Sequence, residues 1–431
     1  ILYMEKQTMA TISTDNFEKN APAPGVLRAL YGDKAEKHAP RFCKLAARHA
    51  ETFGIGCTDF FSSPGRIEIV GNHTDHNAGK VLAAAITVDT LAAVRPREDG
   101  LIEVKSENYP MLRVSLDDLA FRQSELGTSV ALIKGVAEYF IRAGKRAGGF
   151  TACMDSCVPK GSGVSSSSSF ELIIAEIFNY YYNDGRLSPI FMAKASQYAE
   201  NVYFGKPSGL MDQSAIALGG VNMIDFRSFD DPEVVGARWD FDDLDIYVVA
   251  TGGDHSDLTD DYAAIPAEMK AVAEALGGKV LRDIPADKFY AAEDGLRGTL
   301  PPRALLRAEH FYEENLRVER ALKAVGDGDE QAFLKEVNAS GESSAVKLQN
   351  LYSERGDRSI EEALEKASHI DGVLAKRVHG GGFAGTILLF VAKDRSDAVN
   401  EVLNAEFGAD NVFRLFIRES GACRVPFTEE K

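Results

Sequence analysis

Hydrophobic and polar positions follow two rhythms along this chain: strand-like segments dominate the first part and long helical segments the later part. The predicted strands are residues 60–70, 81–94, 101–105, 112–114, 150–154, 221–226, 246–250 and 386–391. The predicted helices are residues 26–54, 129–143, 170–181, 192–202, 262–276, 303–325, 331–339 and 360–367. This pattern predicts an α+β protein with two lobes, joined near residues 226–245. We expect an N-terminal domain over residues 1–230 and a C-terminal domain over residues 231–431.

Length and composition fit a globular enzyme. The chain has 431 residues, which exceeds the usual size of one domain. Its formal net charge of -17 argues against nucleic-acid binding, because phosphate contacts need clusters of Lys and Arg. An acidic protein can still bind the phosphates of ATP through backbone N–H groups at a helix N-terminus.

The five cysteines are scattered, and Cys153 and Cys157 have no second pair or nearby histidines for a zinc site. Residues 1–20 lack the apolar core of a signal peptide, and no apolar run reaches the ~18 residues of a membrane span. These features predict a reduced, cytoplasmic protein that does not enter a membrane. We expect a monomer or a weak oligomer.

A stretch rich in glycine and serine is the strongest chemical signal. Residues 159–169 read PKGSGVSSSSS and lie between a predicted strand and a predicted helix. Glycines allow close approach of the backbone to a phosphate, and serines favour a helix N-terminus. The stretch is neither a Walker A loop nor a dinucleotide fingerprint. A flexible linker is the alternative, but a linker would not run straight into the apolar residues 170–174. The candidate ATP-binding residues are Gly161, Ser162, Gly163, Val164, Ser165, Ser166 and Ser167.

A second segment, residues 64–77, reads PGRIEIVGNHTDHN. Arg66 can neutralise a phosphoryl group during transfer. The side chains that follow suit the hydroxyl groups of a sugar. The candidate sugar-binding residues here are Asn72, His73, Thr74 and Asp75. The alternative is a polar β-turn with a surface arginine.

A candidate acceptor and a candidate metal site come from residues 200–213. Asp212, in the sequence GLMDQ that starts at Gly209, can orient a hydroxyl group; the alternative is a helix N-cap. Glu200 together with Ser167 can hold Mg²⁺, which prefers a few protein oxygens and phosphate oxygens. Read alone, Glu200 is a solvated helix residue.

Together these segments resemble the GHMP kinase family and, within it, the galactokinases. The family's first signature reads roughly GRxNLIGEHTDYNGG, and residues 65–79 read GRIEIVGNHTDHNAG. The second, GxGLSSSASLE, is matched by residues 161–171 with its spacing intact. The third is MDQ at residues 211–213, and the last is a glycine motif, HGGGFAG, at residues 379–385. All four occur in family order.

The resemblance implies a two-lobed GHMP kinase fold, with a mostly antiparallel sheet plus helices in each lobe and the active site between the lobes. It implies transfer of the γ-phosphate of ATP to the anomeric hydroxyl of galactose, with Mg²⁺ held by Ser167 and Glu200. Arg66 would stabilise the phosphoryl group and pair with Asp212, which would act as base or orient the sugar hydroxyl. Tyr262 and Gly209 would lie at the sugar, and Ser106 would reach the nucleotide. Positioning and charge neutralisation would carry most of the rate.

The chain departs from the family pattern at several positions. Asn72 replaces a glutamate, His76 a tyrosine, His379 a threonine and Lys160 an apolar residue. A hydrogen bond to a charged acceptor is worth ~1.5–3 kcal/mol, so galactose would bind more weakly at Asn72. A sugar with a 6-carboxylate, such as galacturonate, would no longer meet a like charge there.

Two other functions compete with a galactose kinase. A mevalonate or homoserine kinase is disfavoured by the His73-Thr74-Asp75 segment. A non-catalytic sugar sensor is disfavoured because the serine loop keeps its full spacing and both Arg66 and Asp212 are present.

Overall fold

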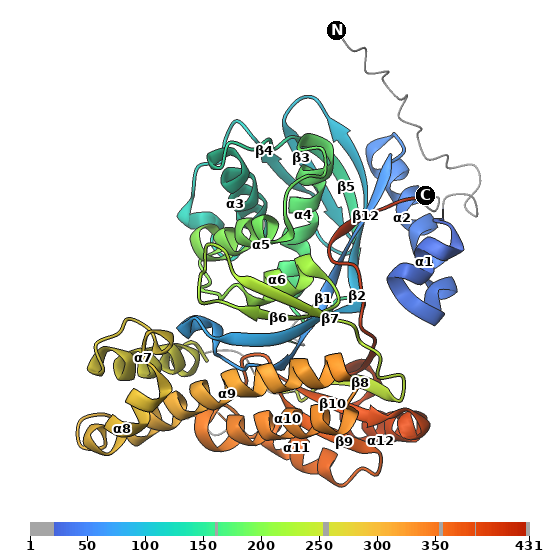
Figure 1. The fold of residues 1–431 in the computed structure, drawn as a ribbon. Helices are drawn as coiled ribbons and strands as arrows, with labels where there is room; N and C mark the ends of the chain where they lie inside the picture. The colour runs from blue at the N-terminus through green and yellow to red at the C-terminus, as the bar shows by residue number, and fades with distance from the viewer. Residues whose placement is uncertain (1–20, 160–162, 253–257, 353–356, 384, 428–431) are drawn as a thin grey trace.

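Two long neighbouring strands, β1 (Asp59–Val70) and β2 (Lys80–Arg97), run through both lobes of the molecule (Figure 1). They pair antiparallel, with irregularities at Pro64/Gly65 and Glu68/Val70. All twelve residues of β1 are buried. The computed structural model describes residues 21–159, 163–252, 258–352, 357–383 and 385–427.

The first lobe is built on an eight-stranded sheet with the order β12-β1-β2-β5-β3-β4, in which β6 also pairs with β2 and β7 with β6. Its further strands are β3 (Leu101–Ser106), β4 (Leu112–Ser115), β5 (Gly149–Ser156), β6 (Val221–Asp225), β7 (Glu233–Ala237) and β12 (Cys423–Val425). Apart from the parallel pair of β3 and β5, the strands pair antiparallel.

Helices cover both faces of this sheet. One face packs against α3 (Ser129–Arg142), α4 (Ser166–Tyr182), α5 (Pro189–Tyr198) and α6 (Met211–Leu218). The other face packs against α1 (Pro24–Tyr31) and α2 (Ala39–Phe53). Because successive strand residues point to opposite faces, Phe61 joins the first core and Phe60 the second.

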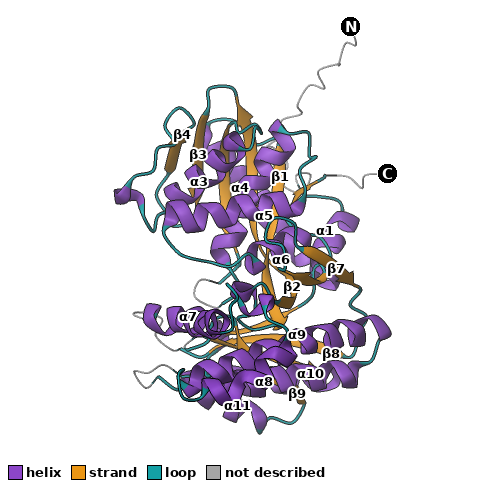
Figure 2. Cartoon of the chain, turned by 60° about the vertical axis from the view of Figure 1, so that its left-hand side comes forward, coloured by secondary structure: helices purple, strands orange, loops and turns teal. Residues whose placement is uncertain are grey.

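The second lobe is a four-stranded antiparallel sheet with the order β11-β8-β10-β9. Its strands are β8 (Leu244–Ala250), β9 (Val373–His379), β10 (Thr386–Ala392) and β11 (Val412–Leu415). One face packs against α9 (Pro302–Asp327), α10 (Glu330–Ser343) and the ends of β1 and β2, and the other against α11 (Ser359–Ser368) and α12 (Ser396–Phe407). Helices α7 (Thr259–Ala275) and α8 (Ala286–Leu296) form a smaller core against α9 (Figure 2).

The expected mixed α+β architecture with two lobes is confirmed. The helix predicted over residues 26–54 is divided into α1, a 3₁₀ helix over Gly32–His38, and α2. The serine stretch was expected to stay irregular to residue 169, but α4 already begins at Ser166. Serine is favoured at a helix start because its hydroxyl can form hydrogen bonds with the backbone N–H groups that have no partner in the first turn. The helix predicted over residues 192–202 becomes α5 followed by a π-helical turn, Ala199–Phe204.

The division into domains 1–230 and 231–431 stays a prediction. The first sheet continues past residue 230, since β7 pairs with β6. Near the end of the chain β12 returns to the first sheet, where Val425 lies opposite Phe60. Of the helices in the described parts of the chain, none is long and apolar enough to cross a membrane.

Candidate active site

The glycine- and serine-rich loop leads directly into the N-terminus of α4. Gly163 and Ser165 both have a positive φ, 68° and 64°, and this turns the backbone before the helix starts at Ser166. The N–H groups of a first helical turn lack intrahelical partners and carry the positive end of the helix dipole. The arrangement can hold an anion. Lys160, Gly161 and Ser162 lie outside the described residues.

Arg66, from β1, meets Asp212, from the first turn of α6. The Arg66 Nε and Nη2 atoms both lie 2.8 Å from Asp212 Oδ1. The Nη1 atom donates to the carbonyl of Gly163, and the Ser165 hydroxyl donates to Asp212 Oδ2. Three segments that are distant in the sequence therefore meet at one point. The glycine- and serine-rich loop (called the phosphate loop below), the Arg66 guanidinium and the Asp212 carboxylate are in direct contact there.

The Asp212 carboxyl stays ionised in this setting. Burial raises its pKa, but Arg66, the Ser165 hydroxyl and Lys206 together outweigh burial, so the pKa lies below its ordinary value. A carboxylate with a lowered pKa is a weak base. It is better suited to accept a hydrogen bond from a hydroxyl group and orient it than to remove its proton early.

Ser167 and Glu200 lie side by side. The Ser167 hydroxyl donates to Glu200 Oε1 at 2.7 Å, and Gln213 Nε2 donates to Glu200 Oε2 at 2.9 Å. Both oxygens of the neighbouring Glu171 carboxyl are buried without a hydrogen-bond partner. Hydroxyl and carboxylate oxygens are ligands that Mg²⁺ accepts, so these residues fit that ion.

A cavity of about 750 Å³ opens beside the serine loop. Ser106, at the end of β3, and Ser166 and Ser167, at the start of α4, all line it. Its wall also includes a group of apolar side chains: Leu112, Leu132, Met154, Val158, Phe170 and Phe204. An apolar chamber that opens onto a phosphate-binding loop suits a nucleotide base.

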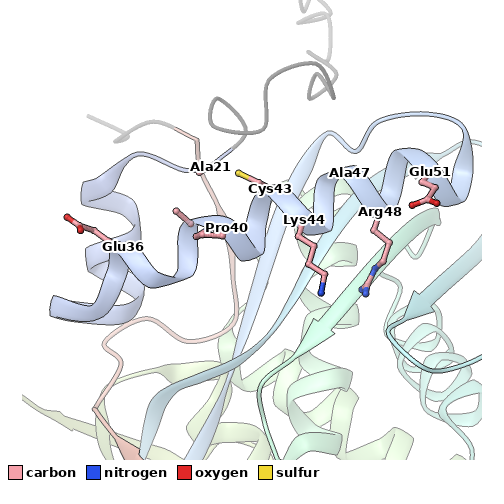
Figure 3. Close-up of a pocket in the computed structure, with 9 residues that line it drawn as sticks. Ala21, Glu36, Pro40, Cys43, Lys44, Ala47, Arg48 and Glu51 are labelled. Atoms are coloured by element: carbon pink, nitrogen blue, oxygen red, sulfur yellow. The ribbon is translucent and has the colours of Figure 1, made fainter.

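A second cavity, of about 810 Å³, lies along α2 on the opposite side of the first sheet (Figure 3). Its lining includes Cys43, Lys44 and Arg48. No residue predicted for phosphate, sugar or metal binding lines it.

The predicted sugar turn follows β1 and is mostly buried, with His73 half-buried and His76 exposed. His73 has a positive φ of 57°, which is uncommon outside glycine, and its Nε2 donates to the carbonyl of Gly381 at 2.9 Å. Burial and His76 lower the pKa of His73 to about 3, so the ring is neutral. Asp75 lies so close to Gly209 that a Cβ atom on Gly209 would come within 1.8 Å of Asp75 Oδ2. Strained backbone of this kind is concentrated at functional sites.

The other two predicted sugar residues face inward. The Thr74 hydroxyl donates to the carbonyl of Lys80 at 2.6 Å and lies 3.0 Å from the carbonyl of Gly71, so it closes the turn itself. The Asn72 side chain is 1% exposed and makes hydrogen bonds on both its nitrogen and its oxygen. Asn72 and Thr74 thus lie in the predicted turn, but their side chains bind other groups of the protein and do not point to a sugar site.

Tyr262 and the C-terminal glycine motif lie against this turn. Tyr262 donates its hydroxyl to the carbonyl of Gly382 at 2.9 Å and packs edge-on against Phe383. His379 Nε2 accepts from the backbone N–H of Glu68 at 3.2 Å. Burial and nearby Arg66 hold the pKa of His379 well below its usual range.

Several charged residues of this region were not predicted from the sequence, among them Lys206, Glu68 and Arg377. Lys206 Nζ lies 3.4 Å from Glu200 Oε1. Glu68 and Arg377 form an ion pair of 2.9 Å behind the sugar turn. Glu68 lies inside the first signature, at the position where the family has asparagine, and that mismatch was a usable signal. Lys206 and Arg377 lie outside the four motifs, and their sequence neighbourhoods carried no signal.

Comparisons with known proteins agree with this geometry. Residues 47–96 match the galactokinase galactose-binding signature, and residues 131–220 match the GHMP kinases N terminal domain. The galactokinase of Streptococcus mutans is 33% identical over 372 residues, which cover 83% of this chain and 91% of that protein. The galactokinase of Clostridium tetani is 29% identical over 82% of this chain and 89% of that protein.

Solved structures give the same result. The crystal structure of Lactococcus lactis galactokinase complexed with galactose matches with a TM-score of 0.76 and 28% identity, over 88% of this chain and 98% of that one. Methanococcus jannaschii mevalonate kinase shares the fold, with a TM-score of 0.59 and 15% identity over 83% of this chain and 98% of that one. This chain therefore belongs to the galactokinase family of the GHMP kinases.

Proposed function

We propose that this protein transfers the γ-phosphate of ATP to the anomeric hydroxyl of galactose, and that Arg66 and Asp212 are the catalytic residues. The contact between these two side chains, beside the glycine- and serine-rich loop, carries the proposal. Arg66 Nε and Nη2 each lie 2.8 Å from Asp212 Oδ1. A loose phosphoryl-transfer transition state needs positioning and charge neutralisation more than covalent help.

Each catalytic residue has one task. Arg66 stabilises the negative charge on the transferred phosphoryl group, and Asp212 accepts a hydrogen bond from the anomeric hydroxyl and aims it at the γ-phosphate. As the new O–P bond forms, the hydroxyl proton passes to Asp212 and the bond to the ADP oxygen breaks. The lowered pKa of Asp212 favours a late proton transfer, when the hydroxyl has become acidic.

Ser167 and Glu200 hold Mg²⁺ in this proposal, and Lys206 lies beside Glu200. When bound, the ion neutralises charge on the phosphate oxygens of ATP. The first turn of α4, with Gly163, Val164 and Ser165 before it, cradles the phosphates. The cavity that contains Ser106 receives the base.

On the sugar side, His73 and Asp75 bind hydroxyl groups, next to Gly209 and Tyr262. Neutral His73 and the Asp75 carboxylate supply the mixture of donor and acceptor that a sugar needs. We further propose a monomer or weak oligomer in the cytoplasm.

An assay of ATP consumption with galactose, galacturonate, N-acetylgalactosamine and arabinose tests the function. We expect turnover with galactose and a product phosphorylated at the anomeric carbon. Turnover with none of the four sugars would overturn the proposal and favour a non-catalytic sensor.

A galacturonate kinase is the second candidate. One observation favours it: Asn72 stands where the family signature has a carboxylate, and the carboxylate beside it, Glu68, is paired with Arg377 at 2.9 Å, so a 6-carboxylate meets less repulsion there. A higher kcat/KM for galacturonate than for galactose in the same assay would select this candidate.

A further inference from the structure

The Asn72 amide has little capacity left for a sugar. Its Nδ2 atom donates to Glu68 Oε1 at 2.9 Å and to the carbonyl of Gly380 at 2.8 Å, which uses both of its hydrogens. Its Oδ1 atom accepts from Asn350 Nδ2 at 2.8 Å. Asn72 therefore acts within the protein, as a link between β1 and the C-terminal glycine motif.

Glu68 is a buried carboxylate of this region, and it pairs with an arginine from the sheet of the second lobe. It is 3% exposed, and its Oε1 atom accepts from Arg377 Nη2, on β9, at 2.9 Å. Arg377 also donates to the carbonyl of Ile69 at 2.7 Å and to Ser340 Oγ at 3.0 Å. A buried ion pair with such additional hydrogen bonds is sensitive to the loss of either partner.

The two residues are an exchanged pair. The family signature has asparagine at the strand position and glutamate at the turn position, and this chain has Glu68 and Asn72 at those two places. In this chain the acid and the amide are hydrogen bonded to each other at 2.9 Å. The negative charge has thus moved from the turn to β1, next to Arg377.

We propose that Glu68 and Asn72 act as one acid–amide unit, and that Glu68, held by Arg377, is the positioning residue that sets the sugar turn. The unit fixes the backbone at Asn72, and the next residue in the chain is His73, with its positive φ. Through the turn it sets where His73 and Asp75 present their side chains. This inference rests on the proposed function, because it assigns the turn to the sugar.

A double-mutant cycle tests the unit in the full chain, with Glu68→Asn, Asn72→Glu and the double variant. Glu68→Asn leaves Arg377 without its carboxylate, and Asn72→Glu sets two carboxylates against each other. We expect each single change to raise the KM for galactose about tenfold or more, while the KM for ATP stays within about twofold. The double variant restores an acid–amide bond, so its KM for galactose should lie below that of either single variant.

Two results would overturn the unit. One is a double variant whose loss equals the product of the single losses, because that outcome means the residues act independently. The other is an equal rise of both KM values, which indicates a general structural defect. If a single variant fails to fold, Glu68→Gln replaces the cycle: it keeps the shape but removes the charge facing Arg377. It should raise the KM for galactose and leave that for ATP unchanged; any other result counts against the unit.

The sugar assay on the wild-type protein tests the proposed function separately from the unit. If wild type uses another of the four sugars, the cycle is read on the KM for that sugar. If it uses none, the thermal unfolding midpoints of the four proteins decide. A midpoint of the double variant above those of both single variants supports the unit, and additive losses overturn it.

Discussion

The phosphate side and the sugar side of this site are built differently. On the phosphate side, residues kept from the family motifs contact one another directly, as Arg66 does Asp212 and Gly163, and as Ser165 does Asp212. On the sugar side, the turn is held by buried polar and charged side chains from distant segments. Gly71 donates its N–H to Glu314 at 3.0 Å, and His310 donates to the Asn72 carbonyl at 2.9 Å.

This difference shows when a sequence motif predicts the contacts of its side chains. A short motif specifies geometry when its own residues make the contacts. When other segments complete the network, a change inside the motif is compensated elsewhere and cannot be interpreted from the motif alone. Asn72 is the example: it reads as a sugar ligand in the sequence and is a buried link in the structure.

The largest effect is expected on the phosphate side, at Arg66. Arg66→Ala removes the charge facing the phosphoryl group and should lower kcat by a factor on the order of 10²–10³, with the KM for galactose changed little. Steady-state kinetics measure this. Arg113→Ala, an arginine on β4 with a 67% exposed side chain, is the matched control and should leave kcat unchanged. A similar loss in both variants would count against the assignment.

The next effect concerns the metal. Glu200→Gln removes one ligand charge and should weaken Mn²⁺ binding, used as a probe for Mg²⁺, by about tenfold or more. Titration followed by electron paramagnetic resonance reads the affinity without any turnover. Glu401→Gln, on the exposed surface of α12, is the control. Unchanged Mn²⁺ affinity in Glu200→Gln would remove Glu200 from the metal site.

A smaller effect is expected in the nucleotide cavity. Ser106→Ala removes one neutral hydrogen-bonding group and should raise the KM for ATP by up to about tenfold, with the KM for galactose unaffected. Ser115→Ala, on the exposed face of β4, is the control. A rise in the KM for galactose alone would contradict the assignment of Ser106 to the nucleotide cavity.

The smallest effect is a pH dependence of stability from the sugar turn. Burial lowers the pKa of His73 to about 3 in the folded protein, against about 6.5 when unfolded. Between these values the unfolded state binds more protons, so the free energy of unfolding is undiminished above about pH 6.5 and falls as the pH drops toward 3. His73→Asn, which tolerates the positive φ, should reduce this slope by up to one proton. Denaturant titrations at several pH values measure the slope, and an unchanged slope would contradict the burial of a neutral His73.

Much of the fold followed from periodicity, because long amphipathic helices such as α9 and buried strands such as β1 carry strong patterns. The strands β7, β9, β11 and β12 were missed, since they are short and only partly buried, and β9 carries the charged Lys376 and Arg377. The helices α6, α8 and α12 were also missed.

The site was predictable to the extent that its contacts lie within motifs. Arg66, Asp212 and the pair of Ser167 and Glu200 were all found in the sequence. The Glu68–Arg377 pair joins residues 309 positions apart, and nothing local marks such a partner. Only the three-dimensional structure identifies it.

The central claim is that the contact between Arg66 and Asp212 marks a site for phosphoryl transfer from ATP to galactose. Its most direct test is ³¹P NMR of a mixture of ATP, Mg²⁺ and galactose with the wild-type protein, next to Asp212→Asn. We predict an anomeric sugar phosphate formed together with ADP by wild type, and at least a hundredfold less by the variant. An equal amount of product from both proteins, or a phosphate at another carbon, would contradict the account.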